Sequence, residues 1–293
     1  MTSNSEVAQS LWSICETTYF RLNLRIRSQH TKNQYRYALN NFAEFLGHTP
    51  TIADLSDDNI AGMMGRLLDE GLESQTVNSR RERIHALWTW LARRGAIGHW
   101  PTTPPLDEPE RIVEAWTIAE MNRLVAGCRA TPGKIGVVPA SEWWIGWHAL
   151  QWNTSERFGA MLAATRAMLR GTALYLPAKI RKGKRKDARY TLWPETLNAL
   201  AAVYHWSHSE KLLPWPYHES TFWNQYGKLL EHAGLPNNRT CKTQKVRRSV
   251  ATHIFANGGD ATAALLHSSD AVTRKHYLDY SICRPQQQDV LPR

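Results

Sequence analysis

The sequence predicts a mainly helical protein with one small β-hairpin or sheet, an α+β fold that divides into two domains. Apolar residues recur at helical spacing over most of the chain. A stretch with four prolines, "HWPTTPPLDEPER" at 99–111, interrupts this spacing, and prolines disfavour helix and stiffen a connector. The spacing changes again at 172–193, where β-branched and aromatic residues flank a basic turn, as in a β-hairpin.

Four segments before the proline-rich stretch have helical spacing, and together they predict a bundle of about 100 residues. The segments are 5–22, 31–47, 56–71 and 74–95. The expected N-caps are Thr31, Ser56 and Ser74, and Gly47, Gly71 and Gly95 follow the last periodic residues. We therefore expect a helical domain at 1–100, a linker at 101–113 and a second domain at 114–293.

The second domain is predicted to contain a hairpin among helices. Its strands are expected within 172–180 and 188–193, and Pro194 fits the first turn of the next helix. The Ser-Ser-Asp turn at 268–270 should cap the last helix. Helices are predicted at 117–128, 140–153, 155–169, 194–206, 218–234, 243–257 and about 260–267.

Composition indicates a globular chain, since 42% of its residues are hydrophobic and suffice for packed cores. There is no apolar run of about 18 residues and no basic segment followed by an apolar one at the start, so we expect a cytoplasmic protein without membrane association. The four cysteines are far apart, with no CxxC pair and no histidine at zinc spacing. They are therefore expected to be reduced and mostly buried thiols, and no metal or other cofactor is predicted.

The formal charge of +10 is concentrated in the second domain. Residues 1–113 carry 12 Lys and Arg against 13 Asp and Glu, whereas the rest carries 24 against 13. A domain this basic favours a polyanion, because each phosphate that it neutralises releases condensed counterions. Basic proteins that bind no nucleic acid fit the composition equally well.

Two basic clusters are candidates for phosphate contacts. The predicted hairpin tip, "KIRKGKRKDAR" at 179–189, has seven bases and one acid, and a two-stranded ribbon can enter a DNA groove. The second cluster opens the helix at 74–95. The alternatives are a solvated turn and a solvated helix face with pairs such as Arg66 and Glu70. The predicted contacts are Lys182, Lys184, Arg185, Lys186, Arg80, Arg81 and Arg83.

Three further segments carry chemically interesting side chains. Arg157, in "NTSERFGAML", is near the start of an apolar helix and must find an anionic partner or reach solvent, and a structural ion pair with Glu156 or Glu142 could supply the partner. In "QKVRRSVATHIFANGG", Arg247 and Arg248 are adjacent, so one should face a site and the other should face outward. In "ALLHSSDAVTRKHYLDYS", His267 precedes Tyr277 by ten residues, although singly each fits an ordinary structural position.

In chain order, these segments resemble the tyrosine recombinases, also called phage integrases, whose pattern is Arg, Lys, HxxR, His or Trp, and Tyr. Arg157 in "NTSERFGAMLAA" matches the first arginine of "TGLRxxELLAL". Arg247 matches the second, since "VRRSVATH" is similar to "LRRTFATH". His267 in "LLHSS" matches "LGHSS", and Tyr277 in "RKHYLDY" matches the nucleophile.

The lysine of the pattern has two candidates, and three positions depart from the family. Lys179 fits "TKT"-like versions and is preferred, while Lys182 fits "GKG"-like ones. The histidine of HxxR is Gln244, which donates a hydrogen bond but cannot exchange a proton at neutral pH. An acid expected three residues after the first arginine is Ala160, and the glycine before the "HSS" histidine is Leu266.

The resemblance implies a core-binding domain followed by a tyrosine-recombinase catalytic domain at 114–293. Such an integrase cleaves and rejoins double-stranded DNA through a 3′-phosphotyrosyl intermediate on Tyr277, with no metal or cofactor. Arg157 and Arg247 would bind the phosphate, with His267 and Gln244 beside them, and Lys179 would protonate the leaving oxygen. Arg248 is expected to contact DNA.

The resemblance also implies assembly and cellular context. The protein is expected to form dimers to tetramers on DNA, with the segment from Tyr277 to Arg293 docking on a neighbouring copy, in a prokaryotic nucleoid and in the service of a mobile genetic element. A type IB topoisomerase shares the chemistry, and a DNA-binding regulator without catalytic activity shares the fold, so both remain alternatives.

Overall fold

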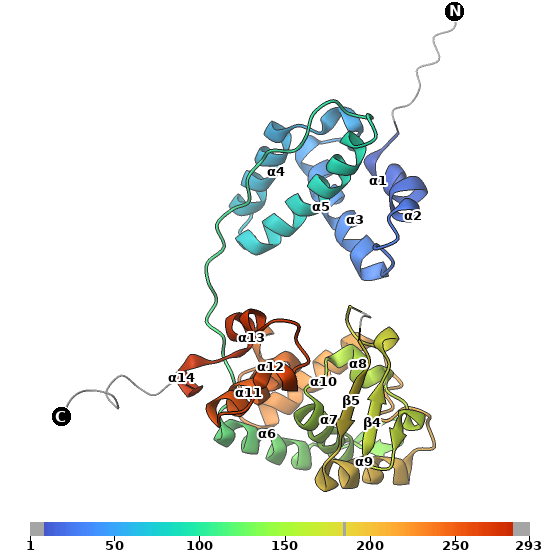
Figure 1. The fold of residues 1–293 in the computed structure, drawn as a ribbon, viewed down its shortest axis with the longest axis vertical. Coiled ribbons are helices and arrows are strands. Elements are labelled where there is room, and N and C mark those ends of the chain that lie inside the picture. Colours follow the sequence, from blue (N-terminus) through green and yellow to red (C-terminus); the bar gives the residue numbers. More distant parts are fainter. Residues whose placement is uncertain (1–8, 184–185, 284–293) are drawn as a thin grey trace, which may run out of the picture. The chain divides into compact units, whose positions relative to one another are not determined.

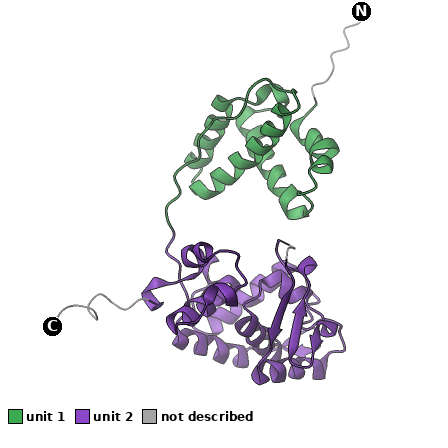
Figure 2. Ribbon diagram, in the orientation of Figure 1, with its two compact units in different colours: residues 1–110 green, residues 111–293 purple. Residues whose placement is uncertain are grey.

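The computed structural model describes residues 9–183 and 186–283. It divides the chain into two compact units, residues 1–110 and 111–293 (Figure 2). The described residues are mostly helical with two small antiparallel sheets, which confirms the predicted fold class. Lys184, Arg185 and the segment after Cys283 lie outside the described residues, and so do the predictions made for them.

Unit 1 is a helical bundle (Figure 1). Its elements are α1 (Leu11–Ile14), a π-helical turn (Cys15–Tyr19), α2 (Phe20–Leu22), α3 (Gln29–Leu46), a 3-10 turn (Ile52–Asp54), α4 (Asp57–Asp69) and α5 (Ser74–Ala92). The apolar stripes of these helices face one another around Phe42, Ile60, Leu87 and Trp88, all of which are fully buried. The helical spacing of the sequence therefore marks the residues that form this core.

The helix ends of unit 1 follow local capping chemistry, with two corrections to the predicted caps. Ser56 caps α4 as predicted. Thr31 is not the cap of α3, because Ser28 Oγ accepts the Thr31 N–H at 3.0 Å and the helix begins at Gln29. Ser74 is the first helical residue of α5, after an extended Glu73. The predicted glycines end the helices in the left-handed region, with φ of 75° at Gly47, 84° at Gly71 and 69° at Gly95.

Much of the proline-rich segment is bound to unit 1. The Asp57 carboxylate accepts the backbone N–H groups of Thr102 and Thr103 at 2.9 and 2.7 Å, and it also accepts their hydroxyls. The Asn78 side chain bonds both backbone groups of Leu106. Prolines donate no backbone hydrogen bond, so side chains of the helices supply the partners that this extended segment needs.

Unit 2 contains the remaining elements. Its first half has α6 (Ile118–Ala130), β1 (Lys134–Ile135), β2 (Val138–Pro139), α7 (Ala140–Thr154), α8 (Phe158–Ala163), a 3-10 turn (Arg166–Met168), β3 (Leu169–Arg170), β4 (Ala173–Leu176), a 3-10 turn (Ala178–Ile180) and β5 (Ala188–Thr191). Its second half has α9 (Pro194–Trp206), α10 (Glu219–His232), a 3-10 turn (Arg239–Cys241), α11 (Thr243–Ala256), α12 (Ala261–Ala264), α13 (Asp270–Tyr277) and α14 (Tyr280–Cys283).

The predicted hairpin is present, and it is part of a three-stranded antiparallel sheet of order β3-β4-β5. Leu174 pairs with Tyr190 and Leu176 with Ala188, which places both leucines in the core. The helix expected over 155–169 is present but shorter, since α8 covers Phe158–Ala163 and the next carbonyl, that of Ala164, accepts the N–H of Leu212 at 3.0 Å. The short antiparallel β1-β2 hairpin was not predicted from the sequence.

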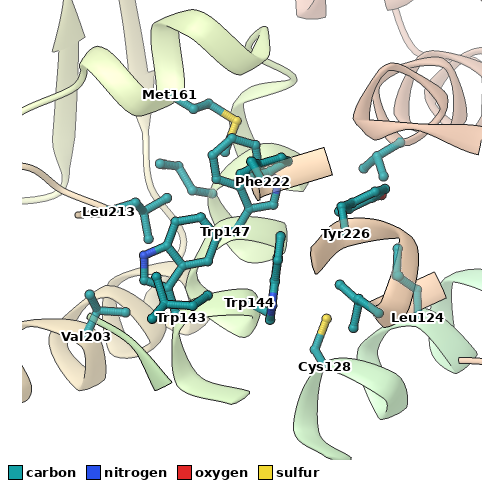
Figure 3. Packing of buried hydrophobic residues seen from close by; sticks show 14 of the residues in the cluster. Leu124, Cys128, Trp143, Trp144, Trp147, Met161, Val203, Leu213, Phe222 and Tyr226 are labelled. Atoms are coloured by element: carbon teal, nitrogen blue, oxygen red, sulfur yellow. The ribbon is translucent and has the colours of Figure 1, made fainter. Parts of the chain in front are cut away.

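Unit 2 is centred on a cluster of aromatic side chains (Figure 3). Trp143, Trp144 and Trp147 project from α7 and pack against Phe222 and Tyr226 of α10, with 4.8 Å between the ring centroids of Trp147 and Phe222. Each such aromatic pair adds about 0.5–1.5 kcal/mol to the free energy of area burial. This packing fixes α7, and the candidate site begins at the end of that helix.

Three of the four cysteines, Cys15, Cys128 and Cys241, are buried, as predicted. Among the described residues, no three histidine, cysteine, aspartate or glutamate side chains form a group that could hold a metal ion. No described helix combines the length and apolar character needed to cross a membrane.

Candidate active site

The first part of the site is the sharp turn between α7 and α8. Ser155 ends α7 in the left-handed region with a φ of 52°, and its N–H donates to Gln151 at 2.7 Å. Two residues later, Arg157 has an extended backbone at the N-cap of α8 and a half-buried side chain. The Ser155 carbonyl at this turn accepts a hydrogen bond from a distant side chain.

That side chain is Arg247 of α11, which is 1% exposed. Its guanidinium donates to the carbonyls of Ser155 and Leu265, the latter at 2.9 Å, and to Nε2 of His267 at 3.1 Å. Burial lowers the pKa of Arg247, and the neighbouring charge of Arg157 lowers it further. Because all three acceptors are neutral, the hydrogen bonds hold the positive charge in place without neutralising it, which suits an anionic ligand.

His267 is held in one tautomer by its two partners. Because Arg247 can only donate, His267 Nε2 must accept, so the ring proton is on Nδ1, which lies 2.9 Å from Thr273 Oγ1. Burial and the charges of Arg247 and Arg157 lower the pKa of His267 to about 4. The ring is therefore neutral at pH 7.

Tyr277, the last residue of α13, is brought to the same place and is 8% exposed. Its ring centroid lies 4.5 Å from that of His267 and 5.5 Å from Cζ of Arg247, and Gln244 Nε2 donates to its hydroxyl at 3.1 Å. Burial raises the pKa of Tyr277, but the charges of Arg247 and Arg157 and their hydrogen bonds outweigh it, so the pKa lies below its ordinary value.

The backbone around Tyr277 is anchored to α11. The Thr252 hydroxyl donates to the Tyr277 carbonyl at 3.1 Å and accepts the N–H of Asp279 at 3.0 Å. The Asp279 carboxylate in turn accepts the N–H of Ala115 at 2.8 Å. Thr252 is one turn after Arg248 on the helix that carries Arg247, so one helix positions both the second arginine and the tyrosine.

The predicted hairpin residues divide into exposed and buried groups. Lys179, on the 3-10 turn Ala178–Ile180, is exposed, and so are Lys182 and Lys186. Arg181 turns inward instead, with a side chain that is 9% exposed, and it donates to Glu156 at 2.6 Å. Arg181 is one of the seven bases of the predicted hairpin tip, and charge alone does not show which of them folds back.

Glu156 was not predicted as a site residue, although it is 1% exposed and lies beside Arg157 in the sequence. Its carboxylate accepts from Arg181, from the Tyr190 hydroxyl at 2.7 Å and from the backbone N–H of Arg157 at 3.2 Å. The alternative of an ion pair between the Arg157 side chain and Glu156 or Glu142 is therefore not what the structure shows. Glu142 accepts the indole N–H of Trp206.

The other predicted DNA contacts have internal partners as well. Arg248 donates to the Thr240 carbonyl at 2.8 Å. In unit 1, the guanidinium groups of Arg80 and Arg83 lie over the rings of Tyr37 and Tyr35, at 5.4 and 5.8 Å from the centroids. Arg81 donates to the carbonyl of Thr103. The pair of Arg66 and Glu70, proposed for a solvated face, is present at 2.7 Å.

The comparisons with known proteins agree with this architecture. Residues 21–95 match the family model of the phage integrase N-terminal SAM-like domain. A lambda integrase (75–356) dimer bound to a COC′ core site has a TM-score of 0.70 at 16% sequence identity, covering 97% of this chain and 99% of that one. No curated protein matches the sequence.

Two further solved structures are similar. A lambda integrase tetramer bound to a Holliday junction gives a TM-score of 0.71 at 17% identity over 94% of this chain and 79% of that one. The Tn1549 transposon integrase (82–397), in complex with circular intermediate DNA, gives 0.70 at 13% identity over 92% and 95%. The resemblance to the tyrosine recombinases is thereby confirmed. Unit 1 carries a phage-integrase SAM-like domain, and the chain as a whole has the integrase fold.

Proposed function

We propose that this protein is a site-specific recombinase that cleaves and rejoins double-stranded DNA through a 3′-phosphotyrosyl intermediate. The observation that carries the proposal is the phenol of Tyr277, which lies beside the fixed charges of Arg247 and Arg157 and has a pKa lowered by both. A tyrosine used only for packing would gain nothing from two buried or half-buried cations. A phosphate would gain two bidentate partners.

Each proposed residue has one role in the cleavage step. The Tyr277 oxygen, having lost its proton to solvent, forms a bond to phosphorus while the bond from phosphorus to the 5′-oxygen breaks. Arg157 and Arg247 stabilise the charge on the nonbridging oxygens, and loss of one such donor costs about 3–4 kcal/mol in the transition state. Lys179 gives its proton to the leaving 5′-oxygen.

The reverse step follows from the same groups. The phosphotyrosyl link keeps the energy of the broken bond, so a 5′-hydroxyl from another strand can attack it and release Tyr277. Gln244, which donates to the Tyr277 hydroxyl at 3.1 Å, stays close to the phosphate throughout, and so does His267. With a pKa of about 4, His267 is neutral at pH 7, and its one ring proton is on Nδ1 beside Thr273. His267 therefore accepts a hydrogen bond or orients Tyr277, and it does not act as a proton donor.

Binding and assembly are part of the proposal. Lys182 and Lys186 on the hairpin, together with Lys184, Arg185, Arg248 and the Arg80, Arg81 and Arg83 cluster, would contact the DNA backbone. Because lambda integrase was seen as a dimer on a core site and a tetramer on a Holliday junction, we propose the same assemblies for this chain. The setting would be the nucleoid of a prokaryotic cell.

A covalent trapping experiment tests the proposal without a known target sequence. The full chain is incubated with a pool of short duplexes whose sequence is randomised around one nick, so that cleavage just before the nick releases a short fragment and traps the protein. Wild-type protein should form a denaturant-resistant adduct, and Tyr277→Phe should form none. Binding without adduct by both proteins would support the DNA-binding regulator instead. Sequencing the trapped DNA gives the recognition site.

A further inference from the structure

The carboxylate of Glu156 joins two separate parts of the proposed active site. One of its oxygens accepts the backbone N–H of Arg157, at 3.2 Å. The other accepts Nε of Arg181 at 2.6 Å and the hydroxyl of Tyr190 at 2.7 Å, and both of these residues belong to the hairpin region. The phosphate-binding turn and the lysine-bearing turn therefore share one anchor, although Glu156 and Arg181 are 25 positions apart.

The two charged groups of this anchor are both largely buried, so each needs the other as its partner. Glu156 is 1% exposed and the Arg181 side chain is 9% exposed, so neither charge is well solvated, and each depends on the other. A buried ion pair is weak evidence for stability, because a packed apolar pair often serves as well. The ion pair does fix the relative positions of the two turns. If the turns moved apart, each buried charge would be left without its partner.

The hairpin is tied to the same arginine on its inner side. Arg181 ends the 3-10 turn that contains Lys179, and its N–H donates to Ala178 at 3.0 Å. Its Nη1 also donates to the carbonyl of Lys186 across the hairpin at 2.8 Å. Lys179 is therefore on a turn whose closing residue is held by Glu156, whereas Lys182 lies beyond the anchored arginine.

We infer that Glu156 is a positioning residue that, through Arg181, holds the Lys179 turn beside Arg157. This inference rests on the proposed function. Ala160, buried in α8, offers no charged group for the task, so the acid next to Arg157 is the one that connects the two turns. Glu156 has no described contact with Tyr277, and its only described contact with Arg157 is to the backbone N–H, so we place its effect on the leaving group in the Lys179 turn.

The leaving group distinguishes this role from a general structural one. The trapped duplex is prepared in two forms, with either oxygen or sulfur as the 5′-bridging atom of the scissile phosphate. A thiolate leaves without a proton donor, so cleavage of the sulfur form bypasses Lys179. Wild-type protein should cleave both. Lys179→Ala should lose between about 10²- and 10⁴-fold on the oxygen form and little on the sulfur form.

Glu156→Gln and Arg181→Met should show the same pattern, with about a tenfold or greater loss on the oxygen form and recovery on the sulfur form. The double variant should lose no more than the worse single variant, because both remove one interaction. Arg181→Lys, which retains the charge, should recover part of the rate. Arg157→Ala should lose activity on both forms, since phosphate contacts are needed for either leaving atom.

Two controls separate the possible failures. Arg189→Met removes one charge from the exposed side of the hairpin, and its loss on the oxygen form must be smaller than that of Arg181→Met. Thermal unfolding of each variant shows whether it is folded, and Arg181→Lys remains informative if Glu156→Gln is not. The inference would be overturned if Glu156→Gln and Arg181→Met lost the same activity on both forms, or lost none. It would also be overturned if Lys179→Ala stayed inactive on the sulfur form. If wild-type protein forms no adduct with either form, the proposed function itself fails.

Discussion

Gln244 Nε2 lies 3.1 Å from the hydroxyl oxygen of Tyr277, although the two residues are 33 positions apart. The amide occupies the position where the family pattern has the histidine of HxxR. An amide can donate a hydrogen bond to a phenolate or to a phosphate oxygen, but it cannot transfer a proton at neutral pH. The site therefore keeps a donor at this position without a titrating group.

The first prediction concerns this donor. Gln244→Ala should slow adduct formation about fivefold to tenfold, which corresponds to the loss of about one hydrogen bond of ordinary strength. Gln244→Glu should be slower still, because a carboxylate accepts where a donor is needed and repels the phosphate. Single-turnover rates on the nicked duplex measure both variants. Equal rates for the two would contradict a hydrogen-bonding role for Gln244.

The second prediction concerns the acidity of the nucleophile. The charges of Arg247 and Arg157 hold the pKa of Tyr277 below its ordinary value in spite of burial. Arg157→Ala should therefore raise this pKa, and the rate of a reaction that needs the phenolate should reach its plateau at higher pH. The difference in absorbance at about 295 nm between each protein and its Tyr277→Phe counterpart follows the ionisation of this one tyrosine. The control is Arg189→Ala, which removes the same charge from an exposed residue far from Tyr277 in the sequence and should leave the pKa of Tyr277 unchanged.

The third prediction concerns stability in mild acid. Burial and the charges of Arg247 and Arg157 lower the pKa of His267 to about 4 in the folded state, from an ordinary value of 6.5. Between these values the unfolded chain binds more protons, so stability is lost as pH falls from 6.5 toward 4. One histidine contributes at most about 1.4 kcal/mol per pH unit, less where solvent screens the ring.

Two other histidines add to the same trend. Burial lowers the pKa of His148 to about 3, and burial together with Arg81 lowers that of His85 to about 4. His267→Asn should therefore reduce the pH dependence without abolishing it. Urea midpoints at several pH values between 4 and 7 measure the effect. An unchanged slope in His267→Asn would show that the ring is not held neutral by its neighbours.

The fourth prediction concerns Leu266, which adopts a φ of 52°. This left-handed conformation costs a residue with a side chain about 1–2 kcal/mol, and glycine avoids the cost but loses more entropy on folding. Leu266→Gly should therefore stabilise unit 2 by about 0.5–1 kcal/mol, which raises the midpoint of thermal unfolding by about 1–4 °C. Leu266→Ala keeps the strained backbone and should give no such gain. A gain in both variants would assign the effect to the half-exposed side chain.

The fifth prediction concerns DNA binding. Lys182 and Lys186 are exposed on the hairpin, so each should contact a phosphate. Replacing both by alanine should reduce the slope of log K against log salt by about 1 for each lost contact. Lys228→Ala, which removes an exposed charge from α10, is the comparison. If removing Lys228 lowered the slope as much as removing either hairpin lysine, the effect would come from the overall charge of the protein and not from phosphate contacts.

The site could be predicted from the sequence to the extent that it depends on short segments. The motifs around Arg157, Arg247, His267 and Tyr277 could be recognised because in chain order they resemble those of the tyrosine recombinases, and the structure brings all four together. The anchor formed by Glu156 and Arg181 could not be found in this way. An acid beside an arginine suggests that these two neighbours pair, and only the fold shows that the acid bonds an arginine 25 positions away.

The sequence by itself determined the elements whose causes are local. Helical spacing gave the helices their positions, Ser56 and the glycines after α3, α4 and α5 gave their ends, and β-branched residues on both sides of a basic turn gave the hairpin. The helix ends follow from interactions between residues a few positions apart, and the hairpin pairs residues at most 18 positions apart, as in Ala173 and Thr191. Hence a single chain segment contains all the information that they need.

Only the tertiary structure decided which polar groups meet. Arg247 binds the Ser155 carbonyl 92 positions away, Gln244 reaches Tyr277, and the proline-rich segment attaches to Asp57. A buried donor or acceptor must find a partner when water is removed, but any of many acceptors would satisfy it. The choice is made by the packing of α7, α11 and the hairpin, because that packing sets the distances between groups that the sequence leaves far apart.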